Sequence, residues 1–157
     1  MIASQIELNF EFKATNNLNA HLNDFKGQYV ILYFYPKDAT PGCTIEGQNF
    51  RDAYSQFKAL HAEVLGVSRD SIKSHENFKA KQNFPFELIS DNEEQLCQLF
   101  NVIKMKSMYG KQVRGIERST FLIDTQSVLK HEWRKVLVKG HVDEVLDTLR
   151  MLPSLCS

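Results

Sequence analysis

The sequence has no excess charge of either sign and no long hydrophobic run. Its 19 Lys and Arg residues balance its 19 Asp and Glu residues, so the formal net charge at pH 7 is zero. A nucleic-acid-binding face usually leaves an excess of basic residues, so we expect no nucleic-acid partner. No apolar run approaches the roughly 20 residues that cross a bilayer, so we expect no membrane partner.

Signals for secretion and for a disulfide framework are also missing. The N-terminal segment MIASQIE lacks the basic start and the apolar stretch of a signal peptide, which favours a cytoplasmic, reducing location. The sequence has three cysteines, Cys43, Cys97 and Cys156, and this odd, irregularly spaced set does not indicate a disulfide scaffold. Each thiol is therefore considered separately, as a core residue, a bystander or a reactive group.

Linkers, repeats and cofactor motifs are equally scarce. We find no internal repeat, no low-complexity tract and no linker rich in Pro, Gly or Ser, so residues 1–157 are predicted to form a single domain. No phosphate-binding glycine loop follows any predicted strand. The histidines lack the close spacing of a zinc site, so we predict neither metal nor cofactor. They are His21, His61, His75, His131 and His141.

What the sequence does contain is a series of strand patterns. Residues 29–35, YVILYFY, form a continuous apolar run that is typical of a strand buried on both faces. Residues 62–68 form a second such run. Residues 120–124 and 128–133 also read as strands, and the three residues between them predict a hairpin.

Helical patterns lie between and after these strands. Apolar residues at three- and four-residue spacing predict a helix face after Cys43, and further helices are predicted over residues 72–82, 92–100 and 141–152. The order of strands and helices predicts an α/β protein with a central mixed sheet flanked by helices. A thioredoxin-like fold matches this order, although other α/β sheets do as well. The apolar face after Cys43 consists of Phe50, Ala53, Tyr54, Phe57 and Leu60.

Cys43 is the residue best placed for chemistry. The first buried strand ends near Tyr35, and residues 36–42 lead into the helix that is predicted to begin near Cys43; reactive groups favour this end of a central strand. There, free backbone N–H groups and the helix dipole would stabilise a thiolate, which is the nucleophilic form. An arbitrary unpaired cysteine is more often a small buried hydrophobe, but the preceding Thr-Pro-Gly and the helix start reverse that preference.

Two other chemistries for Cys43 were considered. Disulfide exchangers carry a second cysteine three positions on, but here that position is Glu46, so dithiol exchange within the motif is excluded. A cysteine hydrolase remains open, because His and Asn partners could converge from distant positions. No residue near Cys43 marks such a hydrolase family.

The segment FYPKDATPGCTIE, residues 34–46, resembles the active-site signature of the peroxiredoxins. It is most similar to the peroxiredoxin Q, or bacterioferritin comigratory protein, branch. The resemblance implies a thioredoxin-like fold and a thiol-dependent peroxidase that reduces hydrogen peroxide and organic hydroperoxides through a sulfenic acid, in antioxidant defence and without metal, haem or flavin. The likeness starts near Leu22, covers nearly the whole chain, and includes residues 50–52, 66–71, 88–91 and 115–124.

The resemblance also implies roles for individual residues. It assigns Cys43 as the peroxidatic cysteine, with Pro36, Thr40 and Arg118 as its companions. The Thr40 hydroxyl, the backbone N–H groups near Cys43 and the Arg118 guanidinium could hold both peroxide oxygens and stabilise the developing charge. Pro36 would shield the site from water. Glu46 suits a helix start on electrostatic grounds and is interpreted as a supporting residue.

Recovery of the oxidised Cys43 is left open by the sequence. Relatives often carry a resolving cysteine at positions that match Gln48 and Lys79, and neither is a thiol here. Cys97 is interpreted first as a packing residue, because it would need local unfolding to reach Cys43, and Cys156 could resolve Cys43 from the C-terminal tail.

We favour a one-cysteine cycle, in which another molecule resolves the oxidised cysteine. The expected reductant is thioredoxin, glutaredoxin or a small thiol, and the resemblance implies a monomer. The absent resolving cysteines also keep open a second class of function, a non-catalytic thioredoxin-like module that senses redox state or holds a protein.

Overall fold

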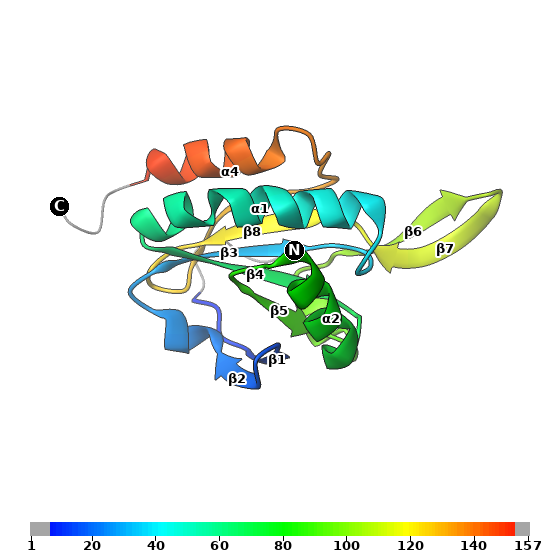
Figure 1. Cartoon of the computed structure of the whole chain (residues 1–157), viewed down its shortest axis with the longest axis horizontal. Coiled ribbons are helices and arrows are strands. Elements are labelled where there is room, and N and C mark those ends of the chain that lie inside the picture. The colour runs from blue at the N-terminus through cyan, green and yellow to red at the C-terminus, as the bar shows by residue number, and fades with distance from the viewer. Residues whose placement is uncertain (1–6, 153–157) are drawn as a thin grey trace.

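The computed structural model describes residues 7–152 and consists of a seven-stranded sheet, a separate two-stranded hairpin and flanking helices (Figure 1). The sheet order is β2-β1-β5-β4-β3-β8-β9, and β6 pairs with β7. The strands are β1 (Glu11–Ala14), β2 (Leu18–His21), β3 (Tyr29–Phe34), β4 (Ala62–Ser68), β5 (Glu87–Ser90), β6 (Ile103–Met108), β7 (Lys111–Ile116), β8 (Ser119–Ile123) and β9 (Leu129–Trp133). The α-helices are α1 (Pro41–Ala59), α2 (Ile72–Gln82), α3 (Gln95–Leu99) and α4 (His141–Arg150), and a 3-10 helix spans Leu22–Phe25.

Strand β3 lies near the middle of the sheet. It pairs in parallel with β4 and antiparallel with β8, and β4 pairs in parallel with β5. Every residue of β3 is buried, which explains its continuous apolar sequence. The predicted mixed sheet and the hairpin between β8 and β9 are confirmed.

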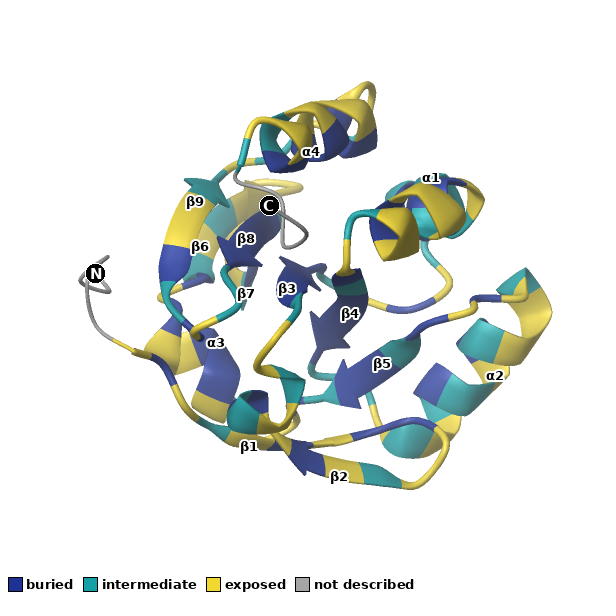
Figure 2. Ribbon diagram, turned by 90° about the vertical axis from the view of Figure 1, so that its left-hand side faces the viewer, coloured by how far each residue is buried: buried dark blue, intermediate teal, exposed yellow. Residues whose placement is uncertain are grey.

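The sheet separates two hydrophobic cores. Alternate residues of β3 point to opposite faces, so Val30, Leu32 and Phe34 join one core while Ile31 and Tyr33 join the other. Helices α1 and α4 cover the second face, and the short α3 packs on the first (Figure 2). In residues 7–152, no helix has both the length and the apolar character that a membrane crossing requires.

Some predicted boundaries are wrong, and several short strands were not predicted. The helix expected over residues 92–100 is only α3, because Glu94 adopts a left-handed backbone (φ 62°) and the Asp91 carboxylate accepts the N–H groups of Leu96 and Cys97 at the helix start. Within the described residues, the last helix ends at Arg150. Strands β1, β2 and β5 have four residues each, too short to give a clear alternation. Strands β6 and β7 contain several exposed polar residues and were also not predicted.

Candidate active site

The loop after β3 places Cys43 in the first turn of α1. Pro41 is the first residue of the helix and Thr40 is its N-cap, with the Thr40 carbonyl accepting the N–H of Thr44 at 2.9 Å. Cys43 is therefore among the residues whose N–H groups have no partner within the helix. Its side chain is only 2% exposed and packs against the α1 side of the sheet.

Arg118 reaches Cys43 from the short segment between β7 and β8. Its Nη2 donates to Cys43 Sγ at 3.6 Å and its Nη1 donates to Glu46 Oε1 at 2.7 Å. Burial would lower the pKa of Arg118, but Glu46 and Cys43 together raise it, so the guanidinium is charged. Gly42 permits this approach, because a Cβ atom there would lie 3.1 Å from Arg118 Nη2.

Glu46 is fully buried beside this arginine. It follows Cys43 by three residues, so both side chains lie on the same face of α1. Burial raises the pKa of Glu46 to about 7, and the Arg118 charge only partly opposes that rise. Its Oε2 and the hydroxyl of Tyr33 have no hydrogen-bond partner among residues 7–152. The site thus contains a carboxyl group that can change protonation state near neutral pH.

The remaining predicted companions border the site. Pro36 and Thr40 are both partly buried in the loop before α1. The Thr40 hydroxyl donates to the Lys37 carbonyl at 2.8 Å and does not cap the helix with its side chain. The structure therefore brings Cys43, Arg118 and Glu46 into direct contact and places the other two residues in the loop that leads to them.

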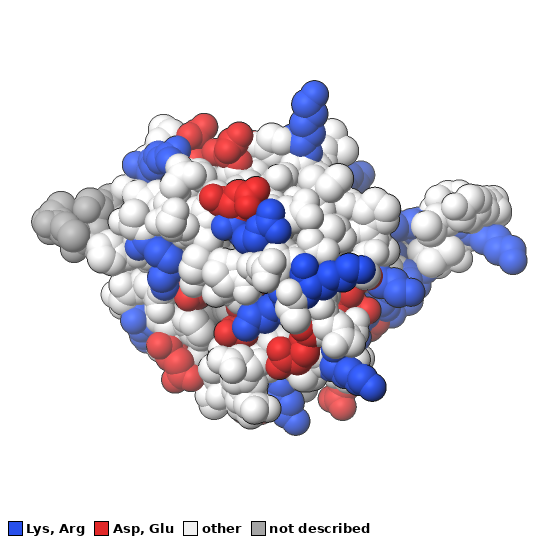
Figure 3. Space-filling model, in the orientation of Figure 1, with Lys and Arg blue, Asp and Glu red and all other residues white. Residues whose placement is uncertain are grey.

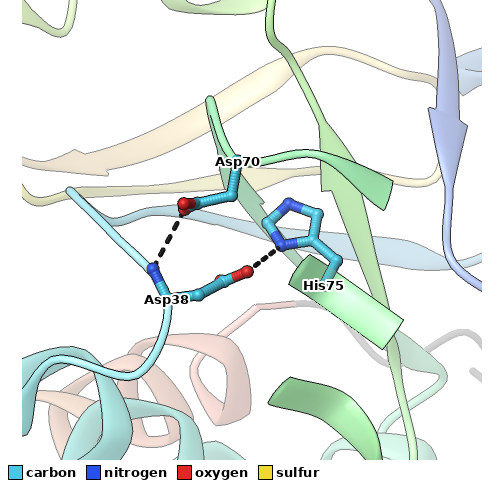
Figure 4. A group of neighbouring side chains, drawn as sticks. All are labelled: Asp38, Asp70 and His75. Carbon is cyan, nitrogen blue, oxygen red and sulfur yellow. Dashed lines mark hydrogen bonds and ion pairs between the residues drawn. The ribbon is translucent and has the colours of Figure 1, made fainter. Parts of the chain in front are cut away.

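A buried polar cluster that the sequence did not reveal holds this loop (Figure 4). Asp38 Oδ2 lies 2.7 Å from His75 Nδ1, and Asp38 also accepts hydrogen bonds from the Tyr35 hydroxyl at 2.6 Å and the Ser74 hydroxyl at 2.8 Å. The Asp38 N–H donates to Asp70 at 2.9 Å. These contacts join the loop to α2 and to the segment after β4.

Hydrogen bonds account for the cluster without a metal ion. Ligand atoms of Asp38, Asp70 and His75 lie within 4.8 Å of one another, a spacing that could suit a cation. His75 Nε2 faces the Ile89 carbonyl at 2.9 Å, which only accepts, so Nε2 carries a hydrogen. Nδ1 lies at hydrogen-bond distance from Asp38 Oδ2, so both ring nitrogens already have a partner within the protein.

Comparison with known proteins identifies the family of this chain. The family model described as "AhpC/TSA family" matches residues 4–132. This chain belongs to the AhpC/TSA family. Peroxiredoxin Bcp of Xanthomonas campestris is 56% identical over 124 residues, which are 79% of this chain and 78% of the relative. Peroxiredoxin Bcp of Bacillus subtilis is 51% identical over 89% of each protein.

Solved structures also place this chain among the peroxiredoxins. A structure of the Xanthomonas campestris bacterioferritin comigratory protein, described for its alkyl peroxide reduction activity, superposes with a TM-score of 0.85 at 50% identity over 90% of both chains. The chain is therefore a peroxiredoxin with a thioredoxin-like fold, and its activity is that of a thiol-dependent peroxidase.

Cys97, the other cysteine of this peroxiredoxin within residues 7–152, does not lie beside Cys43. Cys97 is fully buried in the core on the opposite face of the sheet, and burial followed by the Asp91 carboxylate raises its pKa well above the ordinary range. Gln48 donates to Gln82 at 2.9 Å, and Lys79 pairs with Glu87 at 2.7 Å. Cys156 lies outside the described residues.

Proposed function

We propose that Cys43 is the peroxidatic nucleophile of this thiol peroxidase and that Arg118 stabilises the charge of its reaction. The supporting observation is the Arg118 guanidinium, which donates to Cys43 Sγ at the start of α1. A fixed cation and free N–H groups stabilise the negative charge that develops on the departing oxygen during the reaction. Thr40 and Pro36 complete the loop. The Thr40 hydroxyl would donate to peroxide once it turns away from the Lys37 carbonyl that it contacts at 2.8 Å, and Pro36 would shield the site from water.

In the proposed reaction, the Cys43 thiolate attacks the nearer peroxide oxygen. The S–O bond forms as the O–O bond breaks, so sulfur loses two electrons and the peroxide gains them. The products are a sulfenic acid and an alkoxide or hydroxide, which takes up a proton to leave as alcohol or water. Since Cys43 is almost completely buried, we propose hydrogen peroxide and small organic hydroperoxides as substrates.

For recovery of Cys43, we propose a one-cysteine cycle with an external thiol, either thioredoxin, glutaredoxin or a small thiol. The support is the position of Cys97 across the sheet and the absence of a thiol at positions 48 and 79. We also propose that the protein is a single-domain monomer. We place it in the cytoplasm, in keeping with the free thiols of Cys43 and Cys97. Sedimentation velocity and cell fractionation test these last assignments.

The test of the proposed nucleophile is Cys43→Ser with steady-state peroxide consumption and mass spectrometry. We expect no turnover in the variant, and in the unmodified protein one equivalent of peroxide should place a dimedone-trapped sulfenic acid on Cys43. Retained turnover in Cys43→Ser would refute the assignment. Oxidation of Cys43 that stops after one equivalent with every thiol reductant would support a redox sensor instead.

A further inference from the structure

The β6–β7 hairpin extends away from the main sheet. Within residues 7–152, β6 and β7 pair with each other and not with the seven-stranded sheet. Figure 1 shows the hairpin projecting from the end of the molecule at which α1 begins. The base of the hairpin is anchored to the body of the protein, because Ile116 belongs to a core and Arg114 donates to Glu94, whereas Tyr109 at the turn is exposed.

The charge of this hairpin has one sign. Residues 103–116 contain four basic residues and no Asp or Glu. Figure 3 shows blue side chains and no red ones on the projecting part of the face in view. At the base of the hairpin, a cavity of about 650 Å³ is lined by Lys104, Met105, Arg134 and Lys135, with Glu117 as its one acidic residue. Arg114 is paired with Glu94 at 2.5 Å and Arg134 with Glu132 at 2.9 Å, so the excess positive charge at this end comes from Lys104, Lys106, Lys111 and Lys135.

Large apolar side chains are exposed on the same hairpin. Tyr109 at the turn is 98% exposed, Met105 is 60% exposed and Met108 is 51% exposed. Aromatic residues and Met are enriched in protein interfaces, and flexible Met side chains adapt to different partners. The combination of positive charge with these side chains is typical of a surface that binds an acidic protein.

The hairpin lies next to the reactive cysteine. Strand β7 continues through Glu117 into Arg118, whose guanidinium contacts Cys43. Burial and the charge of Arg118 lower the pKa of Lys106, whereas the charges of Glu117 and Cys43 oppose this change. Lys106 is therefore close enough to interact electrostatically with Arg118 and Cys43. The Val136 N–H donates to the Arg118 carbonyl at 3.0 Å, which places the cavity beside Arg118 as well. A protein bound here would lie close to Cys43.

We propose that the β6–β7 hairpin and the cavity at its base form the docking surface for an acidic protein dithiol that reduces oxidised Cys43. The proposal rests on the proposed function of Cys43. One partner thiol attacks the sulfenic sulfur, releasing water and forming a mixed disulfide, and the second partner thiol then displaces Cys43 as a thiol. Two electrons pass from the dithiol to Cys43, and the partner leaves as a disulfide.

Charge argues against a second copy of this chain as the occupant. Because residues 103–116 contain basic residues and no acidic ones, a symmetric pairing of two hairpins would place positive charge on both sides of the contact, which is unfavourable. An acidic partner has no such cost, and its association would be accelerated by the positive field.

The test compares two reductants on charge-reversed variants at saturating hydrogen peroxide. The protein reductant is a thioredoxin of net negative charge, kept reduced by NADPH and its reductase, and the small reductant is dithiothreitol. We expect Lys104→Glu with Lys111→Glu to raise the KM for thioredoxin at least fivefold at low salt, with turnover by dithiothreitol within twofold of the unmodified protein. High salt should raise the KM of the unmodified protein and reduce the difference.

The matched control reverses two lysines at the other end of the sheet, Lys26→Glu with Lys130→Glu, and should leave both activities unchanged. An equal KM in the hairpin variant and the control would overturn the docking surface, as would turnover with dithiothreitol but not with thioredoxin. A dimer that the hairpin substitutions dissociate in sedimentation would assign the surface to a second copy instead. If the unmodified protein reduced peroxide with neither thioredoxin nor dithiothreitol, the proposed function itself would be overturned.

Discussion

At the scale of single residues, Arg118 is expected to set the rate of peroxide attack. Its planar guanidinium contacts Cys43 and Glu46 at once, a geometry that a lysine ammonium cannot reproduce. We expect Arg118→Ala to lower the second-order rate of Cys43 oxidation by about 100-fold and Arg118→Lys to recover only part of that loss. Stopped-flow tryptophan fluorescence or a competition assay measures this rate. A rate within threefold of the unmodified protein would make Arg118 a structural residue.

Glu46 is expected to make stability depend on pH. Its pKa is about 7 in the folded protein, above the ordinary value of 4.5. Folding therefore favours the protonated form, so the stability contribution is complete below pH 4.5 and is lost as pH rises through about 7. The loss corresponds to about 3 kcal/mol.

Glu46→Gln isolates this effect, because the amide remains neutral and can still accept from Arg118. Urea unfolding of both proteins between pH 4.5 and pH 8 gives the comparison. We expect Glu46→Gln to gain stability relative to the unmodified protein as pH rises. A difference that stays constant over this range would show that Glu46 is ionised throughout.

At the scale of elements, the Asp38–His75 contact connects the active-site loop to α2. Asp38 lies five residues before Cys43, and its carboxylate is fixed by Tyr35, Ser74 and His75. We expect Asp38→Asn and His75→Gln each to slow oxidation of Cys43 by about 10-fold, because a misplaced loop moves the thiolate away from Arg118. Stopped-flow oxidation of Cys43 by peroxide measures the effect.

A double variant distinguishes positioning from simple destabilisation. If Asp38 and His75 act as one unit, combining the substitutions should slow oxidation no more than either alone. Reduction of the oxidised protein by dithiothreitol should stay within twofold. A positioning role would be contradicted if the two substitutions slowed Cys43 oxidation additively. It would also be contradicted if the oxidation rates of the variants simply followed their urea unfolding midpoints.

Strands and helices with a strong apolar pattern were predictable from the sequence. Those that depend on a side-chain contact or on pairing between exposed strands were not. The buried β3 and β4 gave clear runs, and α2 was predicted with its observed bounds. The short α3 depends on the side chain of Asp91, which sequence periodicity does not report. The β6–β7 hairpin is defined by backbone pairing between its two strands, and its apolar residues Met105, Met108 and Tyr109 are exposed, so they did not mark a buried face.

At the scale of the whole molecule, the fold assembles the site from residues far apart in sequence. Cys43 and Arg118 are 75 positions apart, and only resemblance to the peroxiredoxins linked them before the structure was known. Glu46 was interpreted as a supporting residue because a carboxylate suits a helix start, and its contact with Arg118 was not predicted. The contact between Asp38 and His75, 37 positions apart, could not, because both are ordinary polar residues until the sheet brings loop and helix together.

The central sheet separates the thiols of Cys43 and Cys97. Cys43 belongs to the core under α1 and α4, whereas Cys97 belongs to the core on the opposite face. A disulfide requires Cα atoms within about 7 Å, so joining them would require the sheet or α3 to unfold. The buried Cys97 thiol is also hard to ionise, because burial and Asp91 raise its pKa. Cys97 is therefore expected to be a packing residue.

We expect Cys97→Ala to keep peroxidase turnover within twofold of the unmodified protein, with a small loss of stability from the cavity that it leaves. Nonreducing peptide mass spectrometry after one equivalent of peroxide should show no Cys43–Cys97 disulfide. Cys156→Ser provides the parallel test for the C-terminal thiol. A Cys43–Cys97 disulfide together with loss of turnover in Cys97→Ala would establish a two-cysteine cycle. It would also mean that the sheet or α3 unfolds locally during catalysis.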